Sequence, residues 1–150
     1  MGQKITPNLW FNHNAQEAVD FYISVFPNSK IITTSLYPNE WLADFQKEFA
    51  GKILTIDFEL DGQRFIAINA GPEFKFNEAV SFMIACKDQE EIDYYWEKLS
   101  TVPESEQCGW CKDQFGLSWQ VVPENIEELM NKPSAFANLM QMKKIEIAKF

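Results

Sequence analysis

The fold is decided by one block in the last third of the chain, Cys108-Gly-Trp-Cys-Lys-Asp-Gln-Phe-Gly-Leu-Ser-Trp-Gln-Val-Val-Pro123. It contains a Cys-x-x-Cys motif, two tryptophans, an Asp-x-x-Gly turn and an apolar segment that ends at Pro123. Such a block fits either a redox or zinc motif or the closing hairpin of an α/β unit. A thioredoxin-like motif needs its first cysteine at the start of a helix, where the helix dipole stabilises the thiolate. The residues that follow predict a turn and a strand, so the hairpin is favoured.

The cysteines do not support a zinc site or a disulfide framework. A structural zinc site would need a second pair of Cys or His ligands, and the remaining Cys86 and His13 are distant single residues. Three cysteines also predict no disulfide framework. We therefore expect Cys108 and Cys111 to be packing residues, and whether this pair ever oxidises stays open.

The chain repeats itself at a spacing of 74 residues. Asn14 and Glu17 form a capping-box pattern, and Asp88 and Glu91 repeat it 74 positions later. An apolar strand precedes each cap, and a helix with an apolar face follows it. The apolar positions correspond one to one: Ala18, Phe21, Tyr22 and Val25 match Ile92, Tyr95, Trp96 and Leu99.

Each predicted helix is followed by further strands, so the repeated unit is βαβββ. The expected strands are Ile5–Phe11, Lys30–Leu36, Ile53–Leu60 and Arg64–Asn69 in the first copy, and Val80–Cys86, a short one near Thr101, Glu106–Lys112 and Leu117–Val122 in the second. Asp61-Gly62 predicts a tight hairpin turn, and Tyr37–Gly51 is an insertion with a short helix around Trp41–Phe49.

The predicted fold class is therefore α+β, with paired βαβββ modules and a helical tail. We expect one domain, with modules at residues 1–72 and 76–123 and the tail at 124–150. In the tail, we expect packing or dimer contacts from four apolar residues, Phe136, Leu139, Met140 and Met142. Paired modules of this kind can enclose a cavity for a small molecule or a metal.

Composition excludes several classes of function. The net charge of −9 disfavours nucleic-acid binding, because phosphate backbones would be repelled. No apolar run approaches the roughly 20 residues needed to span a bilayer, and the N-terminus lacks the apolar core of a signal peptide, so we expect a cytoplasmic protein without membrane contact. There is no phosphate loop and no Gly-x-Gly-x-x-Gly after a strand, so we expect no nucleotide-type cofactor.

The sequence resembles a known protein family. The resemblance covers nearly the whole chain and is to the PhnB-like family, also labelled the 3-demethylubiquinone-9 3-methyltransferase domain, of the vicinal oxygen chelate superfamily, with glyoxalase I, bleomycin-resistance proteins and extradiol dioxygenases. The residues that carry it are Ile5-Thr-Pro-Asn-Leu-Trp-Phe11, the Phe21-Tyr22 helix ending at Val25-Phe26-Pro27, Gly71-Pro-Glu-Phe-Lys-Phe-Asn77, Ser81-Phe82, and Gly109-Trp110 through Trp119-Gln120. The resemblance implies the glyoxalase/bleomycin resistance/dioxygenase-like fold and, as in many members, a dimer.

The resemblance also implies where a metal would be held. Superfamily enzymes place ligands early on the first strand and on the last strand of each module. These points fall on Pro7, Ser81, Asn69 and Gln120 of this chain. Pro7 has no donor side chain, and neutral oxygens bind divalent transition metals weakly compared with His or carboxylate. We therefore expect no metal at these positions.

Three functions remain open. The first is a metal-independent protein that binds a small molecule, cationic or aromatic in character, in a cavity lined by Leu9, Phe11, Asn69, Ser81, Met83, Trp110, Ser118 and Gln120. The second is a lyase, isomerase or dioxygenase with a displaced metal site, for which His13, Asp57 and Glu59 are the nearby donors. The third is an interaction module with a vestigial cavity. In each case we expect a homodimer.

Overall fold

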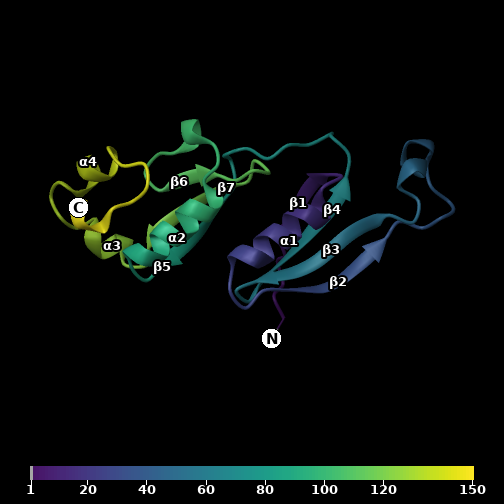
Figure 1. The fold of residues 1–150 in the computed structure, drawn as a ribbon, viewed down its shortest axis with the longest axis horizontal. Coiled ribbons are helices and arrows are strands. Elements are labelled where there is room, and N and C mark those ends of the chain that lie inside the picture. The colour runs from purple at the N-terminus through teal and green to yellow at the C-terminus, as the bar shows by residue number, and fades with distance from the viewer. Residues whose placement is uncertain (1) are drawn as a thin grey trace. The chain divides into compact units, whose positions relative to one another are not determined.

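The computed structural model describes residues 2–150 and divides into two compact units, one ending at Lys75 and the other beginning at Phe76 (Figure 1). Each unit has its own sheet, of four strands in the first and three in the second. The α+β class is confirmed. The predicted union of both modules in a single domain stays a prediction.

The first unit is the predicted βαβββ module. Its elements are β1 (Asn8–Asn12), α1 (Ala15–Val25), β2 (Lys30–Leu36), β3 (Ile53–Leu60) and β4 (Gln63–Ala70). The strand order is β1-β4-β3-β2, with β1 parallel to β4 and the other pairs antiparallel. The insertion carries a short 3-10 helix, η1 (Asp44–Phe49), as the sequence predicted.

The hairpin between β3 and β4 turns at Asp61-Gly62. Both residues have positive φ, +48° and +82°, as a type I′ turn requires. Glycine accepts such an angle without cost, and the turn matches the twist of the two strands. The predicted hairpin is confirmed.

One face of the first sheet is buried against α1 (Figure 1). The helix contributes its apolar stripe, and the strands contribute alternate residues, because successive side chains of a strand point to opposite faces. The buried set is Ala15, Ala18, Val19, Tyr22 and Val25 from the helix, with Leu9, Phe11, Ile56, Phe58, Phe65 and Ala67 from the strands. Full burial of each large side chain contributes about 1.5 to 3 kcal/mol.

The second unit lacks one predicted strand. It contains β5 (Ser81–Cys86), α2 (Gln89–Leu99), η2 (Pro103–Ser105), β6 (Trp110–Lys112) and β7 (Ser118–Pro123), with the order β5-β7-β6. The strand expected near Thr101 was wrong: Thr101 makes a single backbone bond, to Lys112 O at 3.0 Å, and a 3-10 turn then starts at Pro103. Proline lacks the N–H that a sheet ladder needs.

The strand predicted at Glu106–Lys112 is shorter than expected. Cys108 and Gly109 both have positive φ, +53° and +88°, which extended strands do not adopt. The ladder with β7 covers Trp110–Lys112, Gly109 O accepts one further bond from Val121 N at 2.8 Å, and Gln107 makes an isolated bridge to Trp110.

The two predicted helix caps have different outcomes. The Asp88 carboxylate accepts a bond from Glu91 N at 2.9 Å, so the second cap is confirmed. The Asn14 side chain makes no capping bond, so the first prediction was wrong. The side-chain oxygen of Asn69 replaces it and accepts from Ala15 N at 3.1 Å.

The C-terminal tail forms α3 (Ile126–Leu129), α4 (Ala135–Leu139) and η3 (Ile147–Lys149). It is bonded to the hairpin, because Cys108 N and Gly109 N donate to Met142 O and Lys143 O, both at 2.8 Å. Met142 is buried as expected, whereas Phe136 is 66% exposed and Met140 is 48% exposed. No helix within residues 2–150 has the length and apolar character needed to cross a membrane.

Candidate functional site

Within the described residues of the second unit, α2 packs on one face of the sheet, and no other α-helix makes comparable contact with these strands. Trp119, Val121 and Cys111 point to the covered face and are buried. The strand register pairs Met83 with Gln120 and Gln120 with Trp110, and pairs Ser81 with Ser118 and Ser118 with Lys112. Paired residues share a face of a sheet. We call this set, Ser81, Met83, Trp110, Lys112, Ser118 and Gln120, the helix-free face.

Polar groups on the helix-free face are arranged around Ser118. Gln120 Nε2 donates to Ser81 Oγ at 2.9 Å, and Lys112 Nζ pairs with Glu78 Oε1 at 2.8 Å. Ser118 is only 1% exposed, and its hydroxyl finds no hydrogen-bond partner among the described residues. A buried polar group without a partner costs about 1 to 3 kcal/mol. The Ser118 hydroxyl is therefore an unused donor and acceptor on this face, and it lowers the stability of the fold.

Apolar groups lie beside those polar ones. Met83 is 62% exposed although it occupies a strand position, and Trp110 is half-buried opposite Gln120. Exposed apolar side chains next to a few fixed polar groups are typical of surfaces that bind small organic molecules. The five residues predicted for the second module are thus brought together on one face.

The three residues predicted for the first module lie elsewhere. Leu9 and Phe11 are 5% and 2% exposed and lie on the face covered by α1. Asn69 faces the same way, where Oδ1 accepts from Ala15 N and Nδ2 donates to Ile53 O at 3.0 Å. In this structure Leu9 and Phe11 pack in the core, and Asn69 caps the start of α1.

The side chains of β1 and β5 alternate in opposite senses. Leu9 and Phe11 face α1, whereas Met83, the equivalent of Leu9, faces away from α2, because the strand-to-helix connections differ. His13 has φ +62°, whereas the equivalent connection at Lys87 and Asp88 has no left-handed residue. Sequence could not reveal this, since Leu9, Trp10 and Phe11 are all apolar and fit either alternation.

The helix-free side of the first sheet carries Trp10 instead of the predicted residues. Trp10 Nε1 donates to Gly71 O at 2.9 Å, and its ring meets Phe74 edge-on at 4.8 Å. Arg64 donates twice to Asp57, at 2.8 and 2.6 Å. Hydrogen bonding to Arg64 holds the pKa of Asp57 below its usual range, with burial opposing it.

The described residues do not fit the superfamily metal. Ser81 and Gln120 bond to each other, and Asn69 is occupied at both side-chain atoms. Within residues 2–150, no group of three or more His, Cys, Asp or Glu lies close enough to hold an ion. The displaced site predicted from His13, Asp57 and Glu59 is therefore not assembled in this structure, and Asp57 is committed to Arg64.

The cysteine pair has an ordinary structural setting. Cys111 is 1% exposed in β6, and burial, followed by the charges of Asp113 and Glu106, raises the pKa of its thiol to about 12. Cys108 is half-buried in a left-handed turn. A protonated, buried thiol is a poor nucleophile and a poor metal ligand.

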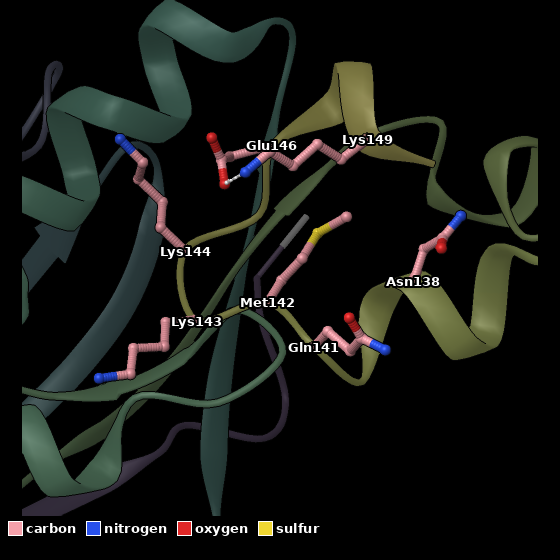
Figure 2. A pocket seen from close by; sticks show the side chains of 7 residues that line it. All are labelled: Asn138, Gln141, Met142, Lys143, Lys144, Glu146 and Lys149. Carbon is pink, nitrogen blue, oxygen red and sulfur yellow. Dashed lines mark hydrogen bonds and ion pairs between the residues drawn. The ribbon is translucent and has the colours of Figure 1, made fainter.

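An open hollow of about 700 Å³ lies in the tail and is lined by seven residues, Asn138, Gln141, Met142, Lys143, Lys144, Glu146 and Lys149 (Figure 2). Two of its three lysines are paired at 2.8 Å, Lys144 with Asp93 and Lys149 with Glu146. This hollow has no signature in the sequence, because its lining comes from a segment with no periodic pattern.

The comparisons with known proteins agree on one fold. Among solved structures, the chain is similar to the PhnB protein from Bacillus cereus, at 33% identity and a TM-score of 0.63 over 80% of this chain and 99% of that one. It is also similar in fold to protein PA1353 from Pseudomonas aeruginosa, at 18% identity and a TM-score of 0.55 over 81% and 98% of the two chains. A mutant of the fosfomycin resistance protein FosX from Listeria monocytogenes, complexed with Mn(II) and 1S,2S-dihydroxypropylphosphonic acid, matches at 15% identity and a TM-score of 0.53 over 88% and 100%. A comparison with curated proteins gave no match.

The two modules and these neighbours define the glyoxalase/bleomycin resistance-like class of the vicinal oxygen chelate superfamily. Residues 3–122 match the family described as 3-demethylubiquinone-9 3-methyltransferase. The chain belongs to this PhnB-like family, as the resemblance had implied.

Proposed function

We propose that this chain binds a small organic molecule on the helix-free face of the second sheet, through side chains rather than through a metal. The observation that carries the proposal is the buried hydroxyl of Ser118, which has no partner among the described residues. Native proteins retain few such groups, and each one calls for an explanation. A ligand that bonds to this hydroxyl would recover the stability that the free protein forgoes.

The surrounding groups define the chemistry of the ligand. Gln120 and Ser81 offer neutral donors and acceptors, while Trp110 and Met83 offer a ring and a soft apolar side chain. Aromatic and thioether groups pack well against flat rings and, for the tryptophan, against cations. With a net charge of −9, the chain also attracts positive ligands. A planar aromatic cation with one hydrogen-bonding group meets these requirements, and the predicted compartment for its binding is the cytoplasm.

The test is a titration followed by methyl NMR of the protein labelled at its methionine methyl groups. The probes are the 6-hydroxymethyl derivatives of N-methylquinolinium, quinoline and 2-naphthoate, which keep the ring system and the hydrogen-bonding hydroxyl and vary the charge. We expect the N-methylquinolinium derivative to shift the Met83 methyl signal saturably and to bind more tightly than the other two. Ser118→Ala should weaken binding about fivefold, as loss of one hydrogen bond does.

The matched control is Ser134→Ala, which changes an exposed serine outside the helix-free face. It should leave the affinity unchanged. A Met83 signal that never moves, or equal binding by Ser118→Ala and the unchanged protein, would contradict the proposed site.

We also propose that the chain forms a homodimer. β5 lies at the edge of its sheet, and Val80 and Met83 are 63% and 62% exposed there. Exposed apolar edges favour pairing with another chain. Light scattering should give the mass of two chains, and a monomer at all concentrations tested would contradict the proposal.

A further inference from the structure

A second hollow is lined by residues of the first unit. It is open, has a volume of about 540 Å³, and is bounded at its apolar side by Leu36 and Ile53. Its polar lining includes His13, Asn14, Glu17 and Lys52. The hollow therefore combines a cation, an anion, an imidazole and an amide within one unit.

Asn14 is the most informative of these residues. It occupies the position before α1 where an asparagine normally caps the helix, yet its side chain makes no such bond. Asn69 Oδ1 accepts from Ala15 N instead. As a result, Asn14 Oδ1 is buried and has no hydrogen-bond partner among the described residues. Because Asn14 lines the hollow, a small rotation of its side chain presents this unpartnered acceptor to a donor bound there.

The two charged groups are also uncommitted. Glu17 and Lys52 form no ion pair with each other or with any other residue of the described part of the chain. The backbone of Lys52 is fixed, since its N–H donates to Phe49 O and its carbonyl accepts from Tyr37 N, both at 2.8 Å. Opposite charges on a shared rim suit a ligand that carries both signs.

His13 is held at the rim by an uncommon backbone conformation. Its φ is +62°, its N–H donates to Ala70 O at 2.8 Å, and its ring lies 5.1 Å from that of Phe49. Left-handed conformation in a residue other than glycine is costly and persists where the surroundings enforce it, often at binding sites.

We propose that this hollow binds a small zwitterion of the amino-acid class. Its ammonium group donates to Asn14 Oδ1 and pairs with Glu17, and its carboxylate pairs with Lys52. The site lies in the other unit from the helix-free face and is independent of the function proposed for that face.

The test is a titration of uniformly ¹⁵N-labelled protein with β-alanine, 6-aminohexanoate, n-butylammonium and butyrate. We expect at least one zwitterion to shift the amide signals of Asn14, Glu17 and Lys52 saturably, about fivefold more tightly than either singly charged probe. Asn14→Leu and Lys52→Met should each weaken that binding about fivefold. Asn125→Leu is the matched control, because Asn125 also precedes a helix without a capping bond and lies outside the hollow.

Thermal unfolding separates a lost site from a lost fold. Because Asn14 Oδ1 is unpartnered, Asn14→Leu should leave the midpoint unchanged or raise it. Lys52 is exposed, so Lys52→Met remains informative if Asn14→Leu does not fold. Equal binding of butyrate and the zwitterions, equal binding of butylammonium and the zwitterions, or no saturation below about 50 mM would each overturn the proposal.

Discussion

Single residues with left-handed backbone fix the shape of the Cys108-to-Pro123 block. Gly109 and Gly116 have φ of +88° and +86° and bracket the short strand β6. They differ in their surroundings. A Cβ on Gly116 would meet nothing within 4 Å, whereas a Cβ on Gly109 would lie 2.8 Å from Ile145 Cδ1 and 3.0 Å from Val121 O.

This difference predicts two costs for the same substitution. Gly116→Ala should destabilise the protein by about 1 kcal/mol, since only backbone strain is added. Gly109→Ala should cost about 3 kcal/mol, because the clash with backbone and tail is added to that strain. Denaturant unfolding of both variants measures this directly, and equal costs would show that the tail does not press on the hairpin.

The thiols provide a second test at the residue scale. Burial raises the pKa of both Cys86 and Cys111 to about 12, whereas Cys108 is half-buried. At pH 8, Ellman's reagent should therefore modify one thiol quickly in the folded protein and all three in guanidinium. Fast modification of two thiols, or a low-pKa Cys111, would restore the redox interpretation of the motif.

At the scale of elements, Asp113 organises the closing hairpin. Its Oδ1 accepts from Phe115 N at 2.8 Å and from Leu117 N at 3.1 Å, and its Oδ2 accepts from Trp119 Nε1 at 2.9 Å. The carboxylate is 1% exposed, so these bonds replace water completely. This arrangement explains why an Asp-x-x-Gly turn and a tryptophan occur together in the block.

Asp113→Asn should destabilise the protein by about 2 to 3 kcal/mol. An amide can still accept from the turn, but its NH₂ group then faces the Trp119 N–H, and a bond to a buried charged group is lost. The control is Asp88→Asn, in which asparagine caps α2 as well as aspartate does. Unfolding midpoints compare the two, and equal losses would contradict the role given to Asp113.

The elements also show what the sequence could predict. The repeat of cap and helix located both modules, because Asp88, Glu91 and the apolar faces of α1 and α2 obey local rules. The Asn14 cap and the pleat of β1 could not be predicted, since Asn69 and the left-handed His13 decide them through contacts distant in sequence. The strand expected near Thr101 was predicted only because the first module has a strand at that point, and Pro103 starts a 3-10 helix there instead. In the candidate site, the predicted alternation of side chains along β5, β6 and β7 was correct. It placed the five residues predicted for the second module on one face of the sheet.

For the whole molecule, three carboxylates link stability to pH. The pKa values of Asp57, Glu78 and Asp93 are all lowered, mainly by hydrogen bonds to Arg64, Lys112 and Lys144 respectively. A lowered folded-state pKa contributes stability that is present above the unfolded value, about 4, and is lost as pH falls through the folded value. Stability should therefore be nearly constant from pH 7 to 5 and should fall below about pH 4.

Denaturant unfolding at pH 7, 5, 4 and 3 checks this dependence. Arg64→Met should flatten the acid side of the curve, because it removes the main cause of the Asp57 shift. An unchanged slope in that variant would show that the Asp57–Arg64 pair does not contribute to the pH dependence.

We propose the helix-free face of the second sheet as the ligand site, and a crystal structure of the protein with the 6-hydroxymethyl derivative of N-methylquinolinium, or with the tightest-binding probe of that series, tests this most directly. The ring should lie against Trp110 and Met83, and the hydroxyl of the ligand or a bridging water should be hydrogen-bonded to the Ser118 hydroxyl. A ligand bound only elsewhere, with Ser118 still buried and unpartnered, would contradict it.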